Sequence, residues 1–117
     1  MDIKVELISN KILLLEPKTD SLDASNVFEF RKQVYGLIEP RKSVVCDLKH
    51  IQFVDSSGLG ALIFCQKTMR ARGGNFRLCG LTPAVKTLFD LMRMERVFET
   101  YSHRNEALVQ LSNLPSL

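Results

Sequence analysis

The chain has 117 residues, of which 45% are hydrophobic and 25% charged, and its formal net charge is +3. This length and composition are typical of one globular domain over residues 1–117, and they exclude a disordered or fibrous protein. The basic residues are scattered and Trp is absent, so no nucleic-acid surface is predicted. The three widely spaced cysteines fit neither a disulfide framework nor a metal site, and we expect buried, reduced thiols.

The chain opens without the basic head and apolar run of a secretion signal. Its longest apolar stretch, residues 59–65, is far too short to span a bilayer. We therefore expect a cytoplasmic protein that does not insert directly into a membrane.

The first elements form a predicted β-hairpin. Residues 3–8 alternate between apolar and charged side chains, which indicates a half-buried strand, and residues 12–15 are continuously apolar, which indicates a more buried one. Apolar residues then recur at helical spacing until Pro40, so we predict a helix with Asp23 or Ser25 as its N-cap.

The rest of the chain alternates between strands and helices. Residues 43–48 predict a central strand covered on both faces. The further predicted elements are a helix from the polar cluster at 55–60 to the glycines at 73–74, a strand at 75–79, a helix beginning at Thr82-Pro83, a short apolar piece at 96–100, and a helix over about 104–111 capped by Ser102. This order predicts an α/β fold, in which a mixed sheet of four to five strands combines the hairpin with parallel crossovers and carries about four helices.

The polar cluster at residues 55–60, with sequence DSSGLG, lies at the N-terminus of a predicted helix. Loops at the carboxyl ends of strands in such sheets commonly meet ligands and partners. Gly58 and Gly60 each cost the helix about 1 kcal/mol relative to Ala. Either they allow tight internal packing, with Asp55 and the serines capping the helix, or they allow a partner or an anion to approach the backbone.

Two catalytic interpretations of this cluster fit poorly. A dinucleotide-binding loop would need a third glycine, and a serine hydrolase would need a G-x-S-x-G turn, which the chain lacks. The only histidines, His50 and His103, have no evident catalytic partner. We predict no catalytic residue, no metal and no cofactor.

Two runs, VVCDL at residues 44–48 and FVDSSGLGAL at residues 53–62, resemble the signature of the STAS family, and within it the bacterial anti-sigma factor antagonists. The resemblance covers nearly the whole chain. It extends to Leu22-Asp23-Ala24, Gly73-Gly74, Thr82-Pro83-Ala84-Val85 and Leu88-Phe89. One departure is Asp20, at a position where the family often has glycine.

The resemblance implies a non-enzymatic partner switch. In such proteins the serine at the position of Ser56 is phosphorylated by an anti-sigma factor, a serine kinase with a histidine-kinase-like ATPase fold, and a serine phosphatase removes the phosphate. The unphosphorylated form binds the anti-sigma factor and releases the sigma factor.

The same resemblance assigns the partner-binding loop, whose members would be Asp23, Asp55, Ser57, Gly58, Leu59 and Gly60. Related STAS proteins regulate phosphatases, cyclases or membrane lipid-transport complexes. A regulatory subunit of such an assembly is therefore the alternative function.

Overall fold

The structure is a computed structural model that describes residues 1–115. Five strands form one mixed sheet in the order β1-β2-β4-β6-β7. They are β1 (Ile3–Leu7), β2 (Ile12–Pro17), β4 (Ser43–Asp47), β6 (Asn75–Cys79) and β7 (Thr100–Tyr101). Strand β1 pairs antiparallel with β2, and the other neighbours are parallel. The predicted hairpin and parallel crossovers are therefore confirmed.

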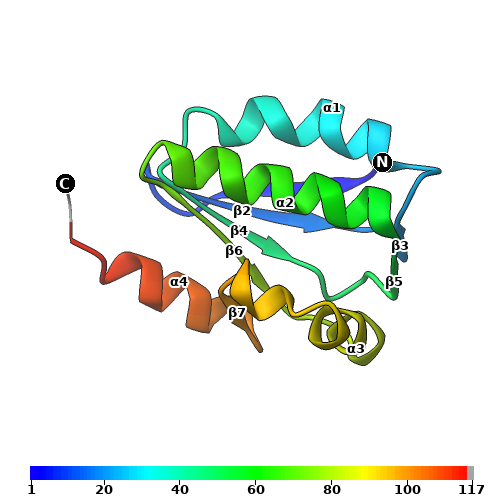
Figure 1. Cartoon of the computed structure of the whole chain (residues 1–117). Helices are drawn as coiled ribbons and strands as arrows, with labels where there is room; N and C mark the ends of the chain where they lie inside the picture. The colour runs from blue at the N-terminus through cyan, green and yellow to red at the C-terminus, as the bar shows by residue number, and fades with distance from the viewer. Residues whose placement is uncertain (116–117) are drawn as a thin grey trace.

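Within residues 1–115, four α-helices pack around this sheet, as predicted. They are α1 (Val27–Ile38), α2 (Ser56–Ala71), α3 (Pro83–Leu91) and α4 (Arg104–Ser112), with the short 3-10 helix η1 (Met94–Arg96) after α3. Figure 1 shows α1 and α2 side by side on one face of the sheet and α4 on the other. Helix α1 ends two residues before Pro40, at the place that the proline predicts.

The alternating side chains of the central strands supply both cores. Leu13 and Leu15 of β2 and Val44 of β4 face α1 and α2 in the larger core. Leu14 and Val45 face the other way and pack with Ala107 and Leu111 of α4 in a smaller one. Strand β4 is buried along its whole length, so the predicted central strand covered on both faces is confirmed.

A second, two-stranded sheet was not predicted. Strands β3 (Ser21–Leu22) and β5 (Phe53–Val54) pair in parallel where the chain leaves β2 and β4 for the next helices. Each has only two residues, too few to show a period in the sequence. Asp20 has no positive φ, and its carbonyl oxygen accepts hydrogen bonds from the backbone of Gln52 and Phe53, so no glycine is required there.

Two predicted helix caps are wrong. Helix α1 begins after Asn26, because residues 23–26 form a turn that precedes the helix. In this turn the Asp23 N–H donates to Oδ1 of Asn26, and the Asn26 N–H donates to the carbonyl oxygen of Asp23. Helix α4 has His103 as its N-cap residue, one position after Ser102. No side-chain hydrogen bond caps either helix, so a polar side chain near the start did not mark the boundary.

Candidate functional site

Asp55 joins the two loops that follow β3 and β5. As the N-cap residue of α2, it accepts a hydrogen bond from the backbone N–H of Gly58 through Oδ1, at 2.9 Å. Its Oδ2 accepts a second one from the backbone N–H of Ala24, also at 2.9 Å, although Ala24 is 31 residues away in the chain. A single carboxylate therefore begins α2 and holds the loop before α1 against it.

Gly58 is required by the same packing. A Cβ atom at this position would lie 2.0 Å from the carbonyl oxygen of Leu22 and 2.7 Å from its carbonyl carbon. Leu22 belongs to β3, whose pairing with β5 fixes its backbone. The capping and packing interpretation of the cluster thus accounts for Asp55 and Gly58.

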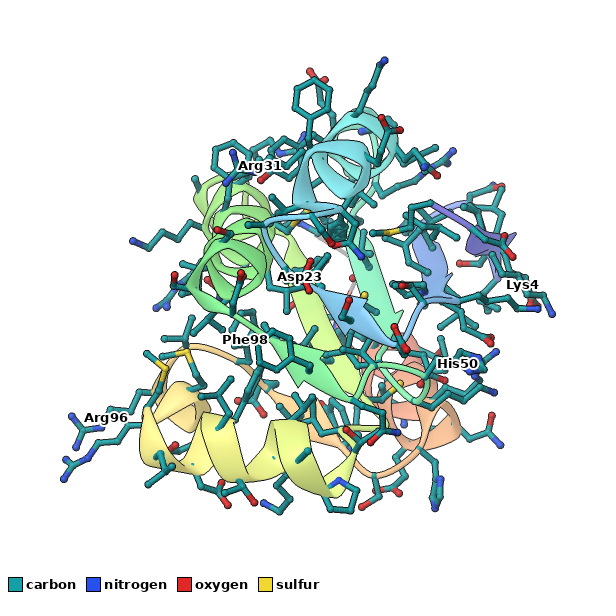
Figure 2. All side chains as sticks on the ribbon, turned by 90° about the vertical axis from the view of Figure 1, so that its right-hand side faces the viewer. Lys4, Asp23, Arg31, His50, Arg96 and Phe98 are labelled. Atoms are coloured by element: carbon teal, nitrogen blue, oxygen red, sulfur yellow. The ribbon has the colours of Figure 1, made fainter. Side chains whose placement is uncertain are left out.

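Asp23 organises the neighbouring loop. Its Oδ1 accepts hydrogen bonds from the backbone N–H and from the hydroxyl of Ser25. The bond from the Ser25 hydroxyl is the main cause that lowers the pKa of Asp23, and it outweighs the opposing effect of burial. Asp23 is therefore ionised, and it lies near the centre of the view in Figure 2.

Ser56 and Gly60 are not explained by packing. Ser56 is the first residue of α2 and is exposed, whereas Ser57 is half-buried and Leu59 belongs to the core. Within residues 1–115, neither serine hydroxyl of this cluster takes part in a hydrogen bond, so these side chains do not satisfy neighbouring N–H groups. Gly60 is exposed, and a Cβ atom there would meet nothing within 4 Å.

Exposed aromatic side chains lie on α1 and α2. Phe64, one turn after Gly60 in α2, is 49% exposed and stacks on Tyr35 of α1, with ring centroids 4.5 Å apart. Phe28, near the start of α1, is 71% exposed. The sequence analysis did not identify these residues. A signal for them was present, because both phenylalanines fall between the helically spaced core positions.

A charged cluster that was not predicted lies on the α4 face. The guanidinium of Arg104 donates to Asp47 at 2.9 Å and to Glu16, and His50 bonds to Glu16 at 2.7 Å. Burial raises the pKa of Glu16, but the hydrogen bonds from Arg104 and His50 and the charge of Lys49 outweigh it and lower this pKa to about 2. The cluster ties α4 to β2 and β4 and does not touch Ser56.

The three cysteines lie in the two cores. Burial raises the pKa of the Cys65 and Cys79 thiols to about 12, and the three cysteines are free and buried, as expected. In the described part of the chain, no group of three His, Cys, Asp or Glu side chains could hold a metal ion. No helix there is long and apolar enough to cross a membrane.

Known proteins resemble this chain over nearly its full length. The STAS domain family model matches residues 7–107. The anti-sigma F factor antagonist of Paenibacillus polymyxa is 28% identical over 113 residues, which cover 95% of this chain and 97% of that protein.

Two solved structures have the same fold. An anti-sigma factor antagonist from Mycobacterium paratuberculosis has a TM-score of 0.86 and 17% identity, and the match covers 96% of this chain and 94% of that one. The phosphorylated form of the Bacillus cell fate determinant SpoIIAA has a TM-score of 0.72 and 17% identity, and the match covers 94% and 99%. Together with the family match, they confirm the predicted α/β STAS fold. The similarity to the Paenibacillus polymyxa protein confirms the resemblance to anti-sigma factor antagonists. The prediction of a non-enzymatic regulator agrees with the name of the Paenibacillus polymyxa protein, which describes an antagonist of another protein.

Proposed function

We propose that this chain, which belongs to the STAS domain family, is an anti-sigma factor antagonist controlled by phosphorylation. Unphosphorylated, it binds an anti-sigma factor that is a serine kinase, and a sigma factor is released. The kinase phosphorylates Ser56 and binding ends. A serine phosphatase then restores the binding form.

The observation that carries this proposal is the exposed Ser56 hydroxyl at the start of α2. A kinase must reach a hydroxyl from solvent, and the Ser56 hydroxyl makes no hydrogen bond within residues 1–115 that would have to be broken first. The surrounding backbone is held by Asp55, through its bonds to Gly58 and Ala24. A turn held in this way therefore presents the exposed Ser56 hydroxyl, whereas Ser57 is half-buried, and a protein of the same fold is known in a phosphorylated form.

The energetic effect of a phosphate at Ser56 differs between the fold and a complex. A phosphoserine carries a charge of about −1.5 to −2, and the helix N-terminus favours an anion by only about 0.3 to 1 kcal/mol. Repulsion from Asp55 across about 5 Å of water is of similar size, so the two effects nearly cancel in the free protein. Burying the same dianion without a partner in an interface costs several kcal/mol, and about 1.4 kcal/mol is a tenfold loss of affinity.

The test compares three substitutions in one capture experiment. Wild-type, Ser56→Ala, Ser56→Asp and Ser57→Ala proteins serve as baits in an extract of the host cell, and mass spectrometry identifies both the partners and any phosphate on the bait. We expect a histidine-kinase-like ATPase on all baits except Ser56→Asp, and phosphate only on the two baits that keep Ser56, wild type and Ser57→Ala. Ser57→Ala is the matched control because Ser57 is the neighbouring serine of the same turn.

Two results would contradict the proposal. The first is phosphate at another residue with none at Ser56, and the second is equal capture of the kinase by wild-type and Ser56→Asp baits. A thermal melt of Ser56→Asp accompanies the capture, because a loss of binding is informative only where the fold is retained.

A further inference from the structure

Strand β1 is an uncovered edge of the five-stranded sheet. It pairs on one side with β2 and has no neighbouring strand on the other within residues 1–115. Its apolar side chains Val5 and Leu7 are 43% and 52% exposed, although their register partners in β2 lie in the core. Figure 2 shows Lys4 extending from this edge into solvent. An edge strand of this kind presents a ready template for another strand.

The hydrogen-bond pattern shows which backbone groups are free at this edge. The backbone N–H of Ile8 donates to Ile12 and the carbonyl oxygen of Asp2 accepts from Lys18, so the even-numbered residues of β1 bond to β2. Because the pattern of an antiparallel pair alternates, the N–H and C=O groups of Ile3, Val5 and Leu7 point away from β2. These three residues have outward backbone groups and apolar side chains on the α1 face.

From this pattern we propose that β1 is a self-association edge, through which two copies of this chain pair antiparallel about Val5 and join their sheets. In this register Val5 faces the Val5 of the second copy, and Ile3 faces Leu7, so all three outward-facing residues exchange backbone hydrogen bonds. A two-fold axis through Val5 makes the contact self-complementary, as in most homodimers.

The charges select this register over its neighbours. Lys4 and Glu6 lie on the other face of β1, and within residues 1–115 neither forms an ion pair. Pairing about Val5 places each Lys4 opposite a Glu6 of the second copy, at the closely spaced positions where side-chain contacts are strongest. Pairing about Lys4 would oppose two lysines, and pairing about Glu6 would oppose two glutamates. Like charges at positions 4 and 6 would repel in each of these registers, whereas the opposite charges of Lys4 and Glu6 favour the register about Val5.

The proposed contact is small and separate from the Ser56 surface. One short strand from each copy buries less area than the roughly 1,200 Å² or more of stable complexes, so we expect a reversible dimer that depends on concentration. Helix α2 packs on β6, which is separated from β1 by β2 and β4. The dimer therefore leaves the start of α2 with Ser56 open, and the inference does not depend on phosphorylation.

Sedimentation equilibrium of the whole chain, from about 10 µM to about 1 mM at low salt, tests the inference. We expect a monomer–dimer equilibrium, weakened about tenfold or more by Lys4→Glu alone or by Glu6→Lys alone, since either change opposes like charges twice in the dimer. An equimolar mixture of the two variants should associate at least as tightly as wild type, because position 4 of one chain again meets an opposite charge at position 6 of the other.

Val5→Pro supplies a test through the backbone. It removes an outward N–H that β2 does not use, so the dimer should be lost while circular dichroism remains that of the folded chain. If this variant fails to fold, the charge variants still decide. A wild-type chain that stays monomeric up to the highest concentration, single reversals that leave association unchanged, or a mixture that fails to restore it would each overturn the inference.

Discussion

The two glycines near the start of α2 should respond oppositely to alanine. At Gly58, a new Cβ would lie 2.0 Å from the Leu22 carbonyl oxygen, so one backbone must move by about 1 Å or more before ordinary contact is possible. At Gly60 nothing lies within 4 Å of the new Cβ. Gly36, in α1, is also exposed and also meets nothing within 4 Å, which makes it a matched control.

The expected stabilities follow from packing and helix propensity. Overpacking costs about 1 to 3 kcal/mol, and because backbone must move we take the upper end; subtracting the helix gain of about 1 kcal/mol leaves Gly58→Ala about 2 kcal/mol less stable than wild type. For a chain of this size, that lowers the melting temperature by about 8 °C. Gly36→Ala and Gly60→Ala gain up to about 1 kcal/mol, which raises it by up to about 4 °C.

Partner binding then separates Gly60 from Gly36. If Gly60 allows a partner to approach α2 beside Ser56, Gly60→Ala should weaken binding of the kinase captured with wild-type bait by about tenfold or more, while Gly36→Ala should not. Calorimetric melts and titrations of the purified kinase measure both properties on the same samples. Wild-type stability of Gly58→Ala would refute the close approach to Leu22. Equal affinity of the Gly60 and Gly36 variants would refute the contact at Gly60.

Two further predictions concern single carboxylates. Because the folded pKa of Glu16 is about 2, below its ordinary 4.5, its ionised form contributes up to about 3 kcal/mol above pH 4.5, and this is lost as the pH falls toward 2. Urea unfolding at pH 7 and pH 3 should therefore show a smaller difference for Glu16→Gln, and an unchanged difference would contradict the account. Asp55→Ala leaves the N–H groups of Gly58 and Ala24 without their acceptor and should cost about 2 kcal/mol by urea unfolding. Asp55→Asn keeps one acceptor oxygen and should lose less stability. Equal losses for the two variants would argue against the pair of hydrogen bonds to Gly58 and Ala24.

Periodic segments of the sequence predicted the sheet and helices well. The alternation at residues 3–7, the apolar run of β2 and the glycines after α2 each reflect a local physical rule, and the structure has the corresponding element. The small β3–β5 sheet and the partner of Glu16 were not predictable in this way. Glu16 meets Arg104 across 88 residues, and nothing in either local segment indicates which distant charge will lie opposite. Exposed aromatic residues were missed because helical spacing identifies the buried face and does not describe the other.

The candidate site divides two tasks between adjacent residues. The Asp55 side chain turns inward, where both carboxylate oxygens accept backbone N–H groups of separate loops, and Ser56 begins the helix with an exposed side chain. A switch needs this division, since a modified residue that also held the fold would change stability each time its state changed. In the proposed switch, the Asp55 side chain holds the turn and is not itself modified. Ser56 would supply the hydroxyl to the kinase, and within residues 1–115 no hydrogen bond of its side chain supports the turn. The energy of a phosphate at Ser56 would therefore act almost entirely on a complex, which is the property that a reversible partner switch requires.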